Sequence, residues 1–324
     1  MIVIASDGGD VGIRQAVQML RDGGSAIDAV EEGIRHVESN PDDVGVGLGG
    51  TPNLLGEVEL DATIMDGATL QAGAVGSVRG YAHPISIARK VMEELWHVFL
   101  VGAGAERFAA EMGFEKTTVL SDRARERWRT SLRVDLGITD PAQLQQAREL
   151  RHIGRLASYT TKVLGTVNFI ARDGKGDICT GVSTSGLGLK YPGRISDSSV
   201  IGAGNYADNR YGAAACTGMG EISIRAASAR SAVLYMKMGM SVEEACLEAM
   251  QDLDVLVGDR HRGIHLIAMD KDGNHYGAAN ALDRTKHIYM TDEMNSFADF
   301  EGHYAPFRTD PKLEPQSDTR DGMR

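Results

Sequence analysis

Two strand-like runs, Thr166–Ala171 and Ile178–Thr184, constrain the fold of this sequence more than any other feature. Both runs are rich in β-branched and apolar residues, and the segment between them carries two glycines and two aspartates, which favour turns. We therefore predict an antiparallel hairpin. If the hairpin is centred on Lys175, residues whose numbers sum to 350 face each other. Thr166 then lies opposite Thr184, with Cβ atoms about 5 Å apart.

Elsewhere the strand patterns fall into groups and do not alternate regularly with helices. This arrangement favours antiparallel sheets covered by helices, an α+β fold, over a doubly wound parallel sheet. Two helices begin at capping-box patterns, Ser25 with Asp28 and Ser241 with Glu244. The predicted helices are Val11–Arg21, Ala26–Glu38, Pro84–Leu95, Ala103–Met112, Gln143–Leu156, Ile222–Met238 and Val242–Leu253. The further predicted strands are Ile2–Ala5, Glu57–Met65, Ala72–Val78, His97–Val101, Ile264–Met269 and His275–Ala279.

Composition excludes several classes of partner. The 45 acidic and 34 basic residues give a formal net charge of −11, which argues against nucleic acid or an anionic membrane. No stretch approaches the ~18 apolar residues of a membrane span, and the first residues lack a basic leader. The three cysteines suit neither a disulfide framework nor a zinc site, so we expect a reducing, cytoplasmic compartment. The histidines show no metal-ligand spacing, and we expect no metal and no cofactor.

The hydroxyl of Thr166, at the start of the hairpin, is a candidate nucleophile. A neutral alcohol is a weak nucleophile and needs a base, and the α-amine of the same residue, with a pKa of about 7.7–8.0, would serve. That amine exists only after the bond between Gly165 and Thr166 has been cut. Gly165 has no side chain to block attack by the hydroxyl on its carbonyl carbon. On its own, however, a Gly-Thr pair before a strand is usually only a turn.

Two downstream segments add groups that suit an amino-acid substrate. Arg194 and Asp197 present a cation and an anion three residues apart, suited to an α-carboxylate and an α-ammonium. An isolated pair of this kind is more often a surface salt bridge. Thr217 and Gly218 come just before a predicted helix, where a hydroxyl and a backbone N–H would stabilise an oxyanion. Their ordinary alternative role is helix capping.

The runs GTV, STSG, KYPGRISDSSVIGAGNYAD and TGMGE resemble the β-subunit of the threonine N-terminal nucleophile amidohydrolases. That family holds glycosylasparaginases, isoaspartyl peptidases and plant-type L-asparaginases. The runs GGSAIDAVEEGIRHVE, GEVELDATIMDG and HVFLVGAGAERFAAEMGF resemble its α-subunit. The resemblance covers nearly the whole chain except residues 120–163 and the C-terminal tail, and the GLGG-TPNLLGE segment is most similar to glycosylasparaginases.

The resemblance implies a role for each matching residue. Thr166 is the nucleophile and, through its amine, the base, and Thr184 supports it. Arg194 and Asp197 hold the substrate's α-carboxylate and α-amine, while Gly220 lines the amine site. The oxyanion hole consists of Thr217 and Gly218.

The resemblance also implies an architecture and a reaction. The expected fold is a four-layer αββα sandwich, with an α-subunit portion (1–165) ending in a mobile linker (about 120–163) and a β-subunit portion (166–324). Two αβ units are expected to form a homodimer. The expected reaction is hydrolysis of the β-amide of an aspartyl group, a small-molecule substrate, through a covalent β-aspartyl-threonine intermediate.

Some positions depart from the glycosylasparaginase pattern. The N-terminal Ser6–Gly9 segment lacks that group's Trp/Phe pair, Gly45 stands where serine is usual, and Gly165 replaces aspartate. Asn168 replaces the glycine that normally follows two residues after the nucleophile. Isoaspartyl dipeptides and asparagine therefore remain alternative substrates.

From a different class, an uncleaved amino-acid-binding relative without activity remains an alternative. The last fifteen or so residues are expected to form a disordered tail. The glycine-rich stretch Gly45–Gly50 is a weak candidate for a nucleotide loop, because the strand-to-helix context and the acidic residue of that fingerprint are missing.

Overall fold

Two β-sheets form the centre of the protein. The computed structural model describes residues 1–43, 45–147, 149–160, 165–259, 263–281 and 285–306. Within these residues the larger sheet consists, in spatial order, of β12 (Ala298–Glu301), β11 (Lys286–Thr291), β1 (Ile2–Ala5), β5 (Thr166–Arg172), β6 (Ile178–Thr184), β2 (Leu60–Asp66), β3 (Ala72–Val78) and β4 (Phe99–Val101). The smaller sheet consists of β13 (His303–Tyr304), β10 (His275–Ala279), β9 (Ile264–Asp270), β8 (Gly212–Gly218) and β7 (Asn205–Asp208). Neighbouring strands run antiparallel except β3 with β4 and β10 with β13.

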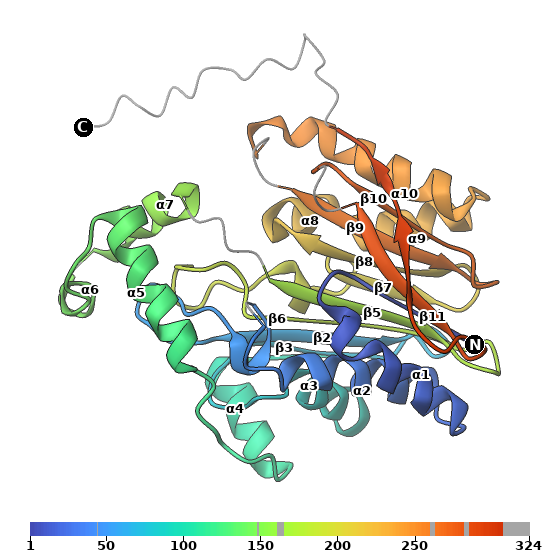
Figure 1. Ribbon diagram of the computed structural model, residues 1–324, viewed down its shortest axis with the longest axis horizontal. Helices are drawn as coiled ribbons and strands as arrows, with labels where there is room; N and C mark the ends of the chain where they lie inside the picture. The colour runs from blue at the N-terminus through green and yellow to red at the C-terminus, as the bar shows by residue number, and fades with distance from the viewer. Residues whose placement is uncertain (44, 148, 161–164, 260–262, 282–284, 307–324) are drawn as a thin grey trace.

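Helices lie on opposite sides of the two sheets (Figure 1). The helices of the first half are α1 (Ile13–Arg21), α2 (Ala26–Glu38), α3 (Pro84–Glu94), α4 (Gly102–Glu111), α5 (Asp122–Leu136), α6 (Ala142–Gln146) and α7 (Leu150–Thr160). Those of the second half are α8 (Gly220–Ala226), α9 (Ser228–Lys237) and α10 (Val242–Gln251). The short 3₁₀ helices are η1 (Gly9–Val11), η2 (Gly47–Gly49), η3 (Asp197–Ser199) and η4 (Asp252–Asp259).

Three buried clusters hold these elements together. The first joins α1 to α4 to the larger sheet, and its members include Val30, Ile34 and Phe169. The second joins α8 to α10 to the smaller sheet. The third lies between the sheets, where Ile170 of β5 and Ile267 of β9 belong to one cluster. The alternating inward and outward side chains of β5 place Phe169 against the helices and Ile170 against the other sheet.

The hairpin at residues 166–184 has the predicted register. β5 pairs with β6 antiparallel from Thr166 opposite Thr184 to Arg172 opposite Ile178. The regular pairing contains no bulge, so every partner pair sums to 350 as expected. The two strands lie in the middle of the larger sheet, flanked by β1 and β2. The hairpin is therefore fixed on both edges, and its open end carries the two threonines.

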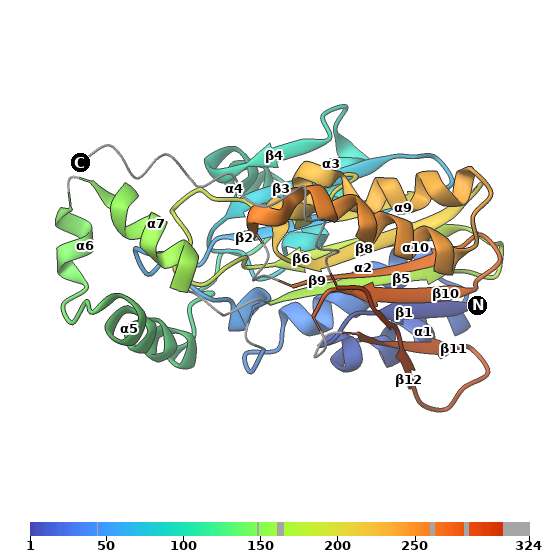
Figure 2. The same cartoon turned by 90° about the horizontal axis from the view of Figure 1, so that it is seen from above.

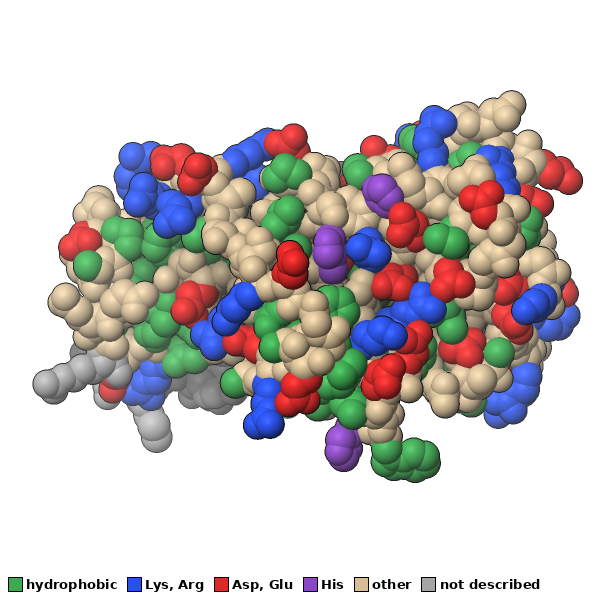
Figure 3. Space-filling view, turned by 90° about the horizontal axis from the view of Figure 1, so that it is seen from below, with side chains coloured by type: hydrophobic (Ala, Val, Ile, Leu, Met, Phe, Trp, Pro, Cys, Tyr) green, Lys and Arg blue, Asp and Glu red, His purple; other side chains and the backbone are tan. Residues whose placement is uncertain are grey.

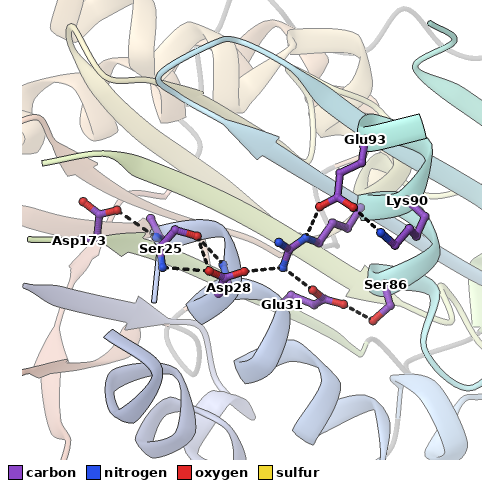
Figure 4. A network of polar contacts seen from close by, with 9 residues as sticks. Ser25, Asp28, Glu31, Ser86, Lys90, Glu93 and Asp173 are labelled. Carbon is purple, nitrogen blue, oxygen red and sulfur yellow. Dashed lines mark hydrogen bonds and ion pairs between the residues drawn. The ribbon is translucent and has the colours of Figure 1, made fainter. Parts of the chain in front are cut away.

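Helix α2 supports this hairpin from below and is itself anchored to α3. The predicted capping box at its start is confirmed: Ser25 Oγ accepts from the Asp28 N–H while the Asp28 carboxylate accepts from the Ser25 N–H. Arg89 of α3 donates to Asp28 at 2.8 Å and to Glu31 at 2.7 Å, so that one guanidinium joins α3 to α2. Figure 4 shows Asp28 and Glu31 within this network of polar contacts. Asp173 of the hairpin turn accepts from the Ala26 N–H at 3.2 Å. The helix and the turn are thus held in one polar network.

Two predicted helices are broken in the structure. The predicted Ile222–Met238 helix is divided at Ala227, which has left-handed φ and ψ values of 51° and 46°. The reason is tertiary: the first N–H groups of α9 donate to carbonyls of the 202–203 loop, including Arg230 N–H to Gly202 at 2.8 Å. The predicted Gln143–Leu156 helix is divided into α6 and α7.

Helices α5, α6 and α7 form a unit at one end of the molecule (Figure 2). They enclose a small apolar cluster of their own with two loops of the body, containing the buried residues Leu54, Leu132, Leu144 and Leu189. The side chain of Trp128 covers Gly56, where an added Cβ would lie 3.0 Å from the indole. This unit covers most of the segment for which a mobile linker is predicted. The predicted C-terminal tail lies outside the described residues.

Candidate active site

A chain of hydroxyl contacts surrounds the bond between Gly165 and Thr166. Thr166 Oγ1 donates to Thr184 Oγ1 at 3.1 Å, and Thr184 Oγ1 in turn donates to the carbonyl oxygen of Gly165. The Gly186 N–H donates to the same Thr184 oxygen at 2.9 Å. Thr184 is fully buried while Thr166 is half-buried at the edge of a cavity. The predicted pairing therefore brings the candidate nucleophile, its supporting hydroxyl and the carbonyl before it into direct contact.

Gly45 lies against Gly165. A Cβ on Gly45 would be 2.2 Å from Gly165 Cα, and a Cβ on Gly165 would be 2.3 Å from Gly45 Cα. The Gly45 loop is held in place because its N–H donates to Asp43 Oδ1 at 2.7 Å and its carbonyl accepts from Ser185 N–H at 2.6 Å. Glycine is thus required at both positions, because a side chain on either residue would prevent the two backbones from approaching this closely.

The candidate oxyanion groups share a cavity with Thr166. This cavity has a volume of about 820 Å³, and its described lining includes Gly165, Thr166, Thr217, Gly218 and His265. Thr217 and Gly218 are the last residues of β8 and pair with His265 and Ile264 of β9. The helix that follows, α8, has only seven residues, so the long helix expected here is wrong in length. A small-molecule substrate fits a cavity of this size.

The candidate substrate-binding residues form a second group. Gly220 begins α8, and a Cβ there would lie 2.7 Å from Asp197 Oδ1 and 3.3 Å from Arg194 Nη2, so that glycine is required. Arg194 donates from Nε and Nη2 to the Glu221 carboxylate at 2.9 and 2.8 Å. Its Nη1 points toward Gly186, where an added Cβ would be 3.1 Å away. None of these five residues is among the described residues that line the cavity at Thr166.

Burial controls the charge of Asp197. The side chain is 3% exposed, and this burial raises the pKa of the carboxyl to about 7, although the nearby Arg194 guanidinium opposes the shift. A carboxyl with this pKa is poised between its neutral and charged forms near neutral pH.

The structure also shows contacts near the site that sequence reasoning missed. Glu221 follows Gly220 directly, and its pairing with Arg194 had no signal in the sequence beyond that proximity. Ser6 Oγ accepts from the Asn168 N–H at 3.0 Å, joining the N-terminal segment to the nucleophile strand. The Asn168 side chain itself is fully buried and makes no hydrogen bond to another described residue.

Comparison with known proteins decides the family. The family model described as asparaginase matches residues 10–298. This chain belongs to the asparaginase family. It is accordingly an amidohydrolase, as the names of its relatives also indicate.

The relatives of this chain carry three different names. It is 39% identical to a plant-type L-asparaginase of Pyrococcus horikoshii, over 84% of this chain and 85% of the relative. It is 38% identical to an isoaspartyl peptidase/L-asparaginase of Rattus norvegicus, over 76% and 69%. It is 36% identical to an N(4)-(β-N-acetylglucosaminyl)-L-asparaginase of Elizabethkingia miricola, over 82% and 73%. These identities differ too little to assign one of the three activities.

On the face shown in Figure 3, acidic and basic side chains are interspersed, without a large patch of one sign. Among the described helices, none combines the length and apolar character needed to cross a bilayer. The described residues contain no group of three His, Cys, Asp or Glu side chains arranged to hold a metal ion.

Proposed function

We propose that this enzyme cuts its own chain between Gly165 and Thr166. It then hydrolyses the β-amide of an aspartyl group with Thr166, which the cut has made an N-terminal residue. The observation that carries the proposal is the contact chain from Thr166 Oγ1 to Thr184 Oγ1 to the Gly165 carbonyl oxygen. It combines a nucleophile, a neighbouring hydroxyl and a polarised carbonyl in one place. Membership of the asparaginase family supports the same chemistry.

Self-cleavage begins when Thr166 Oγ1 attacks the carbonyl carbon of Gly165. The negative charge that develops on the Gly165 oxygen is stabilised by the Thr184 hydroxyl, which already donates to that oxygen. The C–N bond then breaks, the Thr166 nitrogen takes up the proton that the hydroxyl released and leaves as an amine, and an ester joins Gly165 to Thr166 Oγ1. Water hydrolyses the ester to a Gly165 carboxylate and a free Thr166 with both its amine and its hydroxyl.

The mature site would use the same hydroxyl on the substrate. The Thr166 amine accepts the hydroxyl proton while Oγ1 attacks the substrate's side-chain carbonyl, and Thr217 and Gly218 stabilise the oxyanion. The leaving amine takes the proton, and water then hydrolyses the β-aspartyl ester. Arg194 binds the α-carboxylate through its Nη1 edge, because Glu221 occupies the opposite edge. Asp197 binds the α-ammonium, and Gly220 leaves room for it.

Among leaving groups, the segment from Gly47 to Glu57 favours a glycosylamine, since it resembles glycosylasparaginases. The cavity of about 820 Å³ beside Thr166 has room for a sugar. Ammonia and an amino acid are the alternative leaving groups, supported by the relatives named L-asparaginase and isoaspartyl peptidase.

The proposed fold and assembly are those that the resemblance to the family implies. We take the two packed sheets with helices on either side as a four-layer αββα sandwich, divided by cleavage into an α portion (1–165) and a β portion (166–324). The proposal includes a homodimer of two such units, located in the cytoplasm. The homodimer is supported by an exposed apolar stretch around β4. Here Trp96 is 97% exposed, and Val98, Phe99 and Val101 are also exposed. A second copy would cover them.

One experiment tests the proposal directly. Intact mass spectrometry of the purified protein is expected to show two chains of 165 and 159 residues, the second beginning Thr-Val-Asn-Phe. The cleaved protein is then incubated separately with GlcNAc-asparagine, β-Asp-Leu and asparagine. A single uncleaved chain, or cleavage without hydrolysis of any of the three, overturns the proposed function. The relative rates identify the leaving group.

A further inference from the structure

The loop that carries Arg194 and Asp197 rests on two buried carboxylates. It runs from the end of the 187–190 turn into η3, and it lacks regular strand pairing of its own. Beneath it lie Glu59, which is 4% exposed, and Asp61, which is fully buried. Buried carboxylates are unfavourable unless hydrogen-bonded, so their partners show what they hold.

Asp61 of β2 joins the loop to the neighbouring strand. Its Oδ2 accepts from the Ser196 N–H at 2.8 Å and from Ser196 Oγ at 3.0 Å. Its Oδ1 accepts from the Ser77 N–H at 2.9 Å, at the end of β3, where Ser77 has a positive φ of 53°. Ser196 directly precedes Asp197 and lies two residues after Arg194. Both oxygens of Asp61 therefore accept backbone N–H groups, one of them next to a substrate-binding residue.

Glu59 holds the other side of the same loop. Its carboxylate accepts from the Gly193 N–H at 2.9 and 3.2 Å, from Ser77 Oγ at 2.7 Å and from Asn53 Nδ2 at 2.9 Å. Its backbone carbonyl accepts from Lys190 Nζ at 2.9 Å. Gly193 directly precedes Arg194. The two carboxylates thus contact the residue before Arg194 and the residue before Asp197.

We propose that Glu59 and Asp61 are positioning residues, which set the spacing of Arg194 and Asp197 and thereby recognition of the substrate's amino-acid end. The proposal rests on the proposed function, in which Arg194 and Asp197 bind that end. Asp61 lies opposite Thr184 in the pairing of β2 with β6, but both carboxylates direct their hydrogen bonds to other residues, among them Ser77, Gly193 and Ser196. Because self-cleavage depends on Thr184, it reports whether this neighbouring strand keeps its geometry in a variant.

The test is Asp61→Asn. An asparagine offers one acceptor and one NH₂ donor, so one of the two backbone N–H groups faces a donor and the loop shifts. We expect self-cleavage within about twofold of wild type, kcat within about threefold, and a rise in KM of about tenfold or more. The ratio of kcat/KM for the true substrate to kcat/KM for its analogue without the α-carboxylate should fall by a similar factor. A general loss of stability would not change this ratio.

A matched control is available on the same strand. Asp66, at the other end of β2, also accepts from two backbone N–H groups and a hydroxyl, those of Ala68 and Thr69. It holds a surface turn away from the loop that carries Arg194. Asp66→Asn should therefore leave KM within about twofold.

Distinct outcomes separate the two claims. If the wild-type protein hydrolyses no β-aspartyl amide, the proposed function fails. If it does, and Asp61→Asn cleaves itself but keeps a wild-type KM, the positioning role fails. Should Asp61→Asn not fold, Ser196→Ala removes only the hydroxyl contact to Asp61. It must raise KM by about threefold or more, and an unchanged KM again refutes the positioning role.

Discussion

Substituting Gly45 by alanine should slow self-cleavage by about a hundredfold. The added Cβ would lie 2.2 Å from Gly165 Cα, whereas ordinary contacts of a Cβ are 3.4 Å or longer. The two backbones must therefore separate by about 1 Å. A displacement of this size between reacting groups costs on the order of 10²-fold in rate. Gly45 is not among the glycines with positive φ, so alanine is not excluded by the backbone conformation itself.

The displacement should fall on Gly165 and not on Gly45. The Gly45 N–H is held by Asp43 at 2.7 Å, and its carbonyl is held by the backbone and hydroxyl of Ser185 at 2.6 and 2.9 Å. Moving Gly165 shifts its carbonyl carbon away from Thr166 Oγ1. The contact with Thr184 that polarises the carbonyl is then weakened as well.

The assay is a time course of freshly purified precursor on a denaturing gel, with the products confirmed by intact mass. Gly104→Ala is the matched control, because an added Cβ there meets no atom within 4 Å. The control should cleave at the wild-type rate. If Gly45→Ala also cleaves within about threefold of wild type, the reasoning is refuted. Faster cleavage would refute it too, because the close contact would then be shown to hold the two groups apart.

Three further predictions follow. Thr184→Val, which removes the donor to the Gly165 carbonyl, should lower the self-cleavage rate by about 10²-fold or more, measured by the same time course; near-normal cleavage would contradict the role of the hydroxyl. For Asp197, burial raises the pKa to about 7, against about 3.9 in the unfolded chain, so the folded state retains a proton that the unfolded state loses between these values. Stability should consequently fall as pH rises from about 4 to 7, and the advantage of Asp197→Asn in thermal melts should grow over that window; a difference that is constant with pH would show that the carboxyl titrates normally. Trp96→Asp should convert the proposed homodimer into a single unit near 34.8 kDa in light scattering, while an unchanged dimer would place the interface elsewhere.

Much of the site could be predicted because its central element is local. The hairpin at residues 166–184 consists of two strand-forming runs joined by a short turn, and a turn centred on Lys175 fixes the register that puts Thr166 opposite Thr184. The capping boxes at Ser25 and Ser241 were predicted for the same reason, since each involves residues three apart. The resemblance supplied the candidate roles of the remaining site residues, which stay predictions.

Other features depended on residues far apart in the chain. The break at Ala227 has no local signal, because it follows from N–H groups of α9 that bond to the 202–203 loop. Strand β11 was missed altogether, and it lies between β1 and β12 only because the chain returns to its N-terminal strand. The intrinsic helix or strand preference of a residue is a weak guide wherever such contacts compete with it.

The sequence by itself thus determined the hairpin at residues 166–184, its register and the starts of the two helices with capping boxes, since short-range geometry decides them. Only the tertiary structure decided that Gly45 packs against Gly165. It also decided that Glu221 binds one edge of the Arg194 guanidinium, and that Asp61 accepts hydrogen bonds from the residue before Asp197. Each of these contacts joins segments whose approach depends on how the two sheets pack. No pattern of neighbouring residues encodes these contacts, because the distances between the segments are set by the packing of the entire buried core.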